Sequence, residues 1–234
     1  MEVLCILPAR GGSRRVPGKN LALLEGRTLV RRALDTALAS GAFARVALTS
    51  DDPEIRAQAQ GVDADVIERP PELATEAARS FDVVLHALDA VERAWCSRFD
   101  AVAVVQCTSP FTAPADLRDT VALLDADPRA ASAVSVVEVD MLHHPVKLKR
   151  LVDGRLEPWL QADAMAPSHE LPRLYVRNGC VYVSRRALLE AGTFVAEDAL
   201  AHVMPEERSV DIDTPLDLAF AEFLATRGRE GIAS

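Results

Sequence analysis

Cationic and glycine residues gather near the amino end of the chain, in the run from Arg10 through Gly11, Gly12 and Gly18 to Lys19. Glycines let backbone N–H groups approach phosphate oxygens, and arginine and lysine neutralise the phosphate charge. The spacing differs from a Walker A loop, because five residues separate Gly12 from Gly18. The dinucleotide fingerprint G-x-G-x-x-G is also absent. The run predicts a polyphosphate-binding loop of another kind, and the alternative is an ordinary glycine-rich surface loop.

Two carboxylates stand near the other end of the chain, in the alternating sequence Val210-Asp211-Ile212-Asp213. Residues two apart in an extended segment project to the same face, so Asp211 and Asp213 would point the same way. Hard oxygen ligands of this kind suit Mg²⁺ shared with substrate phosphates. We therefore expect these two residues to bind Mg²⁺, with helix capping by Asp213 as the alternative.

Other polar residues have more ambiguous patterns. The sequence Gln106-Cys107-Thr108-Ser109-Pro110 follows an all-apolar run, at the carboxyl end of an expected strand, where open α/β sheets bind ligands. Asp51 and Asp52 are interpreted as helix caps rather than metal ligands. The loop His143-His144-Pro145 is compatible with either a surface position or a ligand-binding one.

The elements that would position these residues alternate along the chain. We expect strands at 3–7, 45–49, 64–67, 101–105, 133–139 and 177–184, and an extended segment at 210–213. Helices are expected at 28–40, 53–60, 80–94, 114–125 and 215–225, and a further helix follows the strand at 177–184 and ends at about 191. The dipeptide Asp153-Gly154 between 146–151 and 155–160 is typical of a hairpin, which would extend from the core. The pattern predicts the α/β class with a mostly parallel sheet.

Composition narrows the class of protein further. A chain of 234 residues with a formal net charge of −9 suits one α/β domain and argues against a general nucleic-acid binder. No apolar run is long enough to cross a membrane, and no signal-peptide pattern follows Met1. Four scattered cysteines without a C-x-x-C pair predict free thiols in a reducing cytoplasm and no zinc site.

Several segments together resemble the CMP-sialic acid synthetases, also called acylneuraminate cytidylyltransferases, which activate nine-carbon 2-keto sugar acids. They follow the family's order over nearly the whole chain. The matching segments are Pro8-Ala9-Arg10-Gly11-Gly12-Ser13, Pro17-Gly18-Lys19-Asn20, Arg69-Pro70 with Glu72-Leu73-Ala74, Ser80, Gln106 to Pro110, His143-His144-Pro145, Asn178-Gly179, and Ser209 to Thr214.

The resemblance implies a Rossmann-like mononucleotide-binding sheet of the nucleotide-diphospho-sugar transferase type, in a single cytidylyltransferase domain over 1–234. An inserted subregion at about 141–177, containing the hairpin, would contact the partner subunit of a homodimer and help to complete its acceptor pocket. The implied reaction is transfer of CMP from CTP to an acidic acceptor, most often a nonulosonic acid, with release of pyrophosphate. No general base is evident.

The resemblance also assigns roles to individual residues. The residues implied in CTP binding are Ala9, Arg10, Gly11, Gly12, Ser13, Lys19, Asn20, Arg69, Ser80 and Gln106. Those implied in acceptor binding are Gln106, His144, Lys147 and Arg177, and those implied in holding Mg²⁺ are Asp211 and Asp213. Within these sets, the catalytic residues would be Arg10, Lys19, Gln106 and Asp211.

The acceptor half of the chain departs from the family pattern. Sugar-acid activators usually carry an arginine just before Leu171-Pro172, where this chain has Ser168-His169-Glu170. Alternative acceptors are therefore a phosphonate or a shorter 3-deoxy keto acid. Two readings from other classes are a sugar-nucleotide glycosyltransferase, with Asp211 and Asp213 as its D-x-D motif, and a non-catalytic nucleotide-binding regulator.

Overall fold

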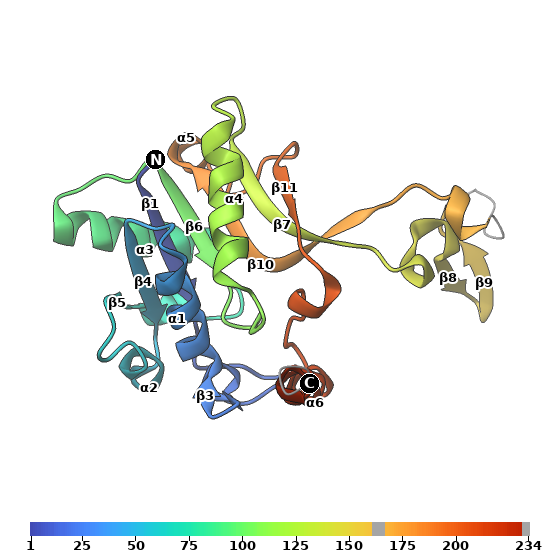
Figure 1. Cartoon of the computed structure of the whole chain (residues 1–234), viewed down its shortest axis with the longest axis horizontal. Helices are drawn as coiled ribbons and strands as arrows, with labels where there is room; N and C mark the ends of the chain where they lie inside the picture. The colour runs from blue at the N-terminus through green and yellow to red at the C-terminus, as the bar shows by residue number, and fades with distance from the viewer. Residues whose placement is uncertain (161–166, 231–234) are drawn as a thin grey trace.

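A seven-stranded mixed sheet organises the molecule, as the computed structural model, which describes residues 1–160 and 167–230, shows (Figure 1). The strand order is β11-β7-β10-β6-β1-β4-β5. Neighbouring strands run parallel except β10, which is antiparallel to both β6 and β7. The strands are β1 (Val3–Pro8), β4 (Arg45–Ser50), β5 (Asp65–Glu68), β6 (Ala101–Val105), β7 (Ser132–Glu138), β10 (Tyr175–Arg185) and β11 (Leu200–Val203).

Helices cover both faces of this sheet. In β1, Cys5 and Leu7 face the core shared with α1 and α4, whereas Leu4 and Ile6 face the core shared with α3 and α5. Burial on both faces explains why β1 and β6 are apolar throughout. The helices are α1 (Leu29–Ser40), α2 (Pro53–Ala57), α3 (Ser80–Trp95), α4 (Pro114–Ala126), α5 (Arg186–Glu190) and α6 (Pro215–Glu230).

Short elements complete the chain. Two of them lie between the cationic loop and α1, so this helix does not follow the loop directly. The small strands are β2 (Leu23–Leu24), β3 (Arg27–Thr28), β8 (Lys149–Val152) and β9 (Arg155–Pro158). The 3₁₀ turns are η1 (Lys19–Leu21), η2 (Pro71–Leu73), η3 (Met141–His143), η4 (Pro145–Lys147), η5 (Ser168–Glu170) and η6 (Glu206–Arg208).

An arm built around the predicted hairpin projects from the sheet beyond β7 and β10 (Figure 1). The strands β8 and β9 pair antiparallel on either side of Asp153-Gly154, with Leu151 opposite Leu156. Both leucines are 72% exposed. The expected subregion at about 141–177 includes this arm, and its residues 161–166, like the chain end at 231–234, lie outside the described residues.

The structure differs from the expected elements in three places. Residues 210–213 form no strand, because Ile212 bonds through its N–H to the Thr108 carbonyl rather than to a neighbouring strand. The strand β11 was not predicted, although it pairs with β7 at the sheet edge. Helix α2 ends at Ala57, and Asp52 caps it alone, with its carboxylate accepting from the N–H groups of Glu54 and Ile55.

Candidate active site

A cavity of about 350 Å³ lies where β1, β5 and β6 end, at the carboxyl edge of the sheet. Open α/β sheets commonly bind ligands at this edge. Its walls bring together most of the residues that the sequence predicted to bind a nucleotide. Those lining it are Arg10, Ser13, Lys19, Asn20, Arg69, Ser80, Gln106 and Asp213, together with Arg14, Arg15, Glu76 and Thr108.

The loop near residue 10 and the acidic segment near residue 213 meet at this cavity. The Lys19 ammonium donates to the Asp213 carboxylate at 3.0 Å and to the Ile212 carbonyl at 2.8 Å. Arg15 forms an ion pair with the other Asp213 oxygen at 3.1 Å. The amino-terminal loop and Asp213 of the acidic segment therefore lie at the same cavity.

Several polar groups of the glycine loop are engaged in holding its shape. Ala9 is fully buried and donates its N–H to the Thr49 carbonyl, whereas Gly11 donates its N–H to the Asp51 carboxylate at 3.1 Å. The Asn20 side chain donates to the Arg10 carbonyl at 2.9 Å. These three residues therefore support the loop, because each of the donor groups named here bonds to another part of the protein.

Steric space distinguishes the two neighbouring glycines of the loop. A methyl group on Gly11 would lie 2.7 Å from the Asp52 carboxylate, closer than non-bonded atoms allow. A methyl group on Gly12 would meet no heavy atom within 4 Å. Gly11 is therefore needed for the close approach of the loop to the start of α2, whereas Gly12 faces open space.

Two arginines give the cavity its positive character. Arg69 is 5% exposed, donates to the Thr49 carbonyl at 2.8 Å, and leaves its Nε without a partner. Burial lowers the pKa of Arg69, the Asp51 carboxylate opposes this shift, and the nearby Arg10 charge adds to it. Within 1–160 and 167–230, neither arginine forms an ion pair. A buried guanidinium facing a second one favours an anionic ligand between them.

The remaining wall comes from the ends of a strand and a helix. Gln106 follows β6 directly, and its backbone N–H bonds to the Cys180 carbonyl. Ser80 is the first residue of α3, so the amino end of this helix faces the cavity. The free N–H groups and positive dipole at a helix amino end favour negative charge there.

The two predicted metal ligands do not face the same space. Asp213 lines the cavity described above, whereas Asp211 lines a neighbouring one of about 710 Å³. The Asp211 residue is exposed, but its carboxylate is mostly buried, and this burial raises the pKa of Asp211. A hydrogen bond from Thr108 opposes the shift, and the charge of Asp213 adds to it. Over the described ranges, no group of three or more His, Cys, Asp or Glu side chains is arranged to hold a metal ion.

Three of the four residues implied in acceptor binding lie apart from the cavity. His144 is 2% exposed at the base of the arm, and its ring nitrogens contact the Val146 N–H at 3.4 Å and the Pro172 carbonyl at 3.3 Å. Lys147 closes the next turn of the arm, and Arg177 is exposed on β10. Of the acceptor set, the structure places Gln106 alone at the cavity.

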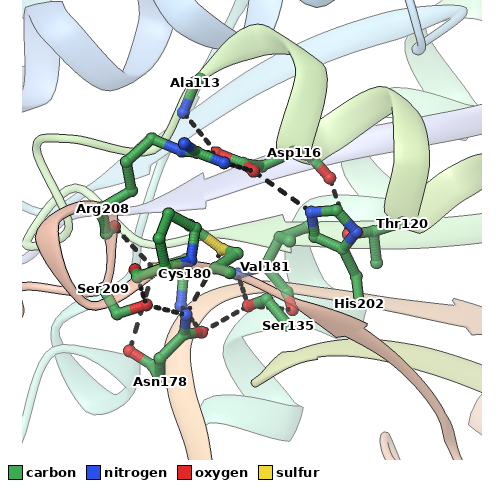
Figure 2. Close-up of polar contacts among 12 residues, drawn as sticks. Ala113, Asp116, Thr120, Ser135, Asn178, Cys180, Val181, His202, Arg208 and Ser209 are labelled. Carbon is green, nitrogen blue, oxygen red and sulfur yellow. Dashed lines mark hydrogen bonds and ion pairs between the residues drawn. The ribbon is translucent and has the colours of Figure 1, made fainter. Parts of the chain in front are cut away.

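Sequence reasoning assigned helix capping to Asp51, and it missed Asp116 and Arg208. Asp51 supports Gly11, which is 40 positions away in the chain, and Asp116 binds Arg208 over 92 positions. Figure 2 shows the second pair within a larger group of buried contacts. No periodicity or spacing in the sequence could have indicated these pairs, because each forms only when separate elements pack together.

Comparison with known proteins identifies the family. The family model described as "Cytidylyltransferase" matches residues 4–225. The chain belongs to the cytidylyltransferase family. It is therefore a CTP-dependent nucleotidyltransferase, which favours the predicted CMP transfer over the glycosyltransferase and regulator alternatives.

Individual relatives agree with this assignment. The chain is 30% identical to the CMP-N,N'-diacetyllegionaminic acid synthase of Legionella pneumophila, over 99% of this chain and all of that protein. It is 29% identical to the N-acylneuraminate cytidylyltransferase of Escherichia coli, over 94% of this chain, and spans about half (51%) of that protein's length. These matches confirm the resemblance found in the sequence.

A solved structure confirms the predicted fold class. A CMP:2-keto-3-deoxy-manno-octonic acid synthetase complexed with CTP aligns with a TM-score of 0.72 over 97% of this chain and all of that one, at 19% identity. In the described part of this cytidylyltransferase, no helix is long and apolar enough to cross a membrane.

Proposed function

We propose that this cytidylyltransferase transfers CMP from CTP to a sialic-type nonulosonic acid and releases pyrophosphate. The relatives' names support this choice of acceptor, since those proteins are named for legionaminic and acylneuraminic acids. The observation that carries the proposal for the nucleotide is the pair Arg10 and Arg69, which face the cavity without a carboxylate partner in the described residues.

The residues of the cavity suit an in-line displacement at the α-phosphorus of CTP. The acceptor hydroxyl would lose its proton and bond to this phosphorus, while the bond to pyrophosphate breaks. Such a reaction depends mainly on alignment and charge neutralisation. In this proposal Arg10, Arg69 and Lys19 bind the triphosphate, and Gln106 positions the reacting groups between β6 and α3.

We further propose that Asp211 and Asp213 hold Mg²⁺ in the CTP complex. The donor set fits, because Mg²⁺ is commonly bound by one or two carboxylates together with substrate phosphates and water. Asp213 lies two positions from Asp211, and its charge adds to burial, which raises the pKa of Asp211. When bound, the ion would neutralise phosphate charge and lower the pKa of the attacking oxygen. Lys19 and Arg15 form ion pairs with Asp213 at the cavity wall.

A homodimer would complete the acceptor side of the site. The arm exposes Leu151, Leu156 and Trp159, and it carries His144 and Lys147 away from the cavity of its own subunit (Figure 1). We propose that the arm packs on a second copy and brings Lys147 to the acceptor's carboxylate there. The four free cysteines support a reducing cytoplasm as the site of action.

The test is release of pyrophosphate from CTP with Mg²⁺ and a panel of acceptors. We expect turnover with nonulosonic acids and little with phosphonates or shorter 3-deoxy keto acids. Turnover with a phosphonate alone would overturn the acceptor assignment. Arg10→Ala should lower kcat/KM by about 100-fold or more, as loss of a transition-state contact does. The matched control Arg129→Ala removes an arginine that is 93% exposed, paired with Asp127 and outside the cavity lining, and should change kcat/KM little.

A further inference from the structure

A buried carboxylate at the start of α4 gathers partners from distant parts of the chain. Asp116 is 1% exposed, and Arg208 donates two hydrogen bonds to it, at 3.0 and 2.9 Å (Figure 2). His202 of β11 contacts it at 3.1 Å, and the Ala113 N–H donates at 2.8 Å. Arg208 is thereby fixed to helix α4 by a bidentate, charge-assisted pair.

A second chain of hydrogen bonds reaches the next residue. The Ser135 hydroxyl of β7 donates to the side-chain Oδ1 of Asn178 at 2.6 Å, and the side-chain Nδ2 of Asn178 donates to the Ser209 hydroxyl at 2.9 Å. Ser209 in turn donates to the Pro205 carbonyl at 2.8 Å. Asn178 lies where the register of β10 against β7 shifts, so the irregularity of the strand directs this amide toward Ser209. Figure 2 shows both groups converging on Arg208 and Ser209.

The anchored residues directly precede the acidic segment. Asp211 follows Ser209 by two positions, and from there the buried Ile212 and the Lys19 contacts hold the chain to Asp213. The buried Cys180 thiol lies against the start of this segment. Its sulfur also donates to the Arg208 carbonyl at 3.8 Å.

We propose that Asp116 and Arg208 are positioning residues for the reaction, which set the place of the 211–213 segment and so hold Asp213 at the nucleotide cavity and Asp211 at the neighbouring one. The inference rests on the proposed function, because it assigns these carboxylates to the CTP–metal complex. Neither residue lines the cavity, so neither touches the substrate. The Asp116–Arg208 pair fixes the chain just before the acidic segment. The Lys19 contacts to Ile212 and Asp213 fix the end of that segment.

The test compares Arg208→Lys with Arg186→Lys. Arg186 also donates two hydrogen bonds to one carboxylate, Glu92, at 2.6 and 3.0 Å, but it belongs to α5, on the sheet face opposite α4. Lysine keeps the charge and loses the bidentate geometry at either position. Ser209→Ala provides a second variant, which removes the Asn178 anchor and the hydrogen bond to the Pro205 carbonyl but leaves the Arg208–Asp116 pair in place. Each protein is measured for thermal unfolding, for Mn²⁺ binding in the presence of CTP by electron paramagnetic resonance, and for exchange of the Ile212 amide.

We expect Arg208→Lys to weaken Mn²⁺ binding by about 10-fold, as loss of an outer support does, and to speed exchange at Ile212. Arg186→Lys should shift the melting temperature similarly and leave the other two readouts unchanged. Equal behaviour of the two variants in all three readouts would overturn the proposal. Failure of the proposed function would give a different result, because the wild-type protein would then release no pyrophosphate with any acceptor. Mn²⁺ binding and exchange of the Ile212 amide would still report on positioning in that case.

Discussion

The contact between Lys19 and Asp213 joins the two ends of the chain at the cavity, and its removal has a calculable effect. We predict that Lys19→Met lowers the free energy of unfolding by about 2 kcal/mol, because a hydrogen bond from a charged donor contributes about 1.5–3 kcal/mol. The value lies below the sum for two such bonds because the Asp213 side chain is 42% exposed and keeps its pair with Arg15. The expected fall in melting temperature is about 4–8 °C.

A double-mutant cycle separates the contact from other effects of the substitution. Lys19→Met, Asp213→Asn and the double variant are unfolded in urea, with Lys149→Met as control because Lys149 is exposed on the arm. We expect a coupling energy of about 1 kcal/mol between the two positions, and a change within about 0.5 kcal/mol for the control. Additivity of the two single substitutions would refute the reasoning that this pair closes the site.

Three further predictions concern other parts of the molecule. Gly11→Ala should cost about 1–3 kcal/mol in urea unfolding through overlap with α2, whereas Gly12→Ala should be nearly neutral. Iodoacetamide should add once to the native protein, at the exposed Cys96, because the other thiols are buried and burial raises the pKa of Cys107 to about 12; a second adduct by mass spectrometry would contradict this. Burial alone would raise the pKa of Asp116, but hydrogen bonds from Arg208, the Ala113 N–H and His202 lower it overall. The stabilisation of the fold by ionised Asp116 is therefore present above the unfolded-state pKa of about 3.9, and it is lost as the pH falls through the folded-state pKa. Asp116→Asn should accordingly show a shallower loss of melting temperature below about pH 4.

Elements with a local signal could be predicted from the sequence. The apolar runs of β1 and β6, the periodicity of α1 and α3, and the Asp153-Gly154 turn each reflect burial or backbone preference within a few residues. The edge strand β11 gave no such signal, because alternate residues of an edge strand are exposed and its pairing partner lies far away in the chain. For residues 210–213 the error was the reverse, because the sequence alternates like a strand but the segment has no neighbouring strand to pair with.

The candidate active site likewise has features that the sequence determined and features that only the tertiary structure decided. The sequence alone determined which charges exist, namely the arginines and Lys19 of the loop and the carboxylates of the acidic segment, because side-chain chemistry is carried by the residue itself. Only the tertiary structure decided that Asp213 faces the cavity while Asp211 faces a neighbouring one, and that the Gly11 N–H is held by Asp51. It likewise brought Lys19 to Asp213 across 194 positions. Such contacts depend on how the sheet orders its strands, and the packing of many distant residues together sets that order.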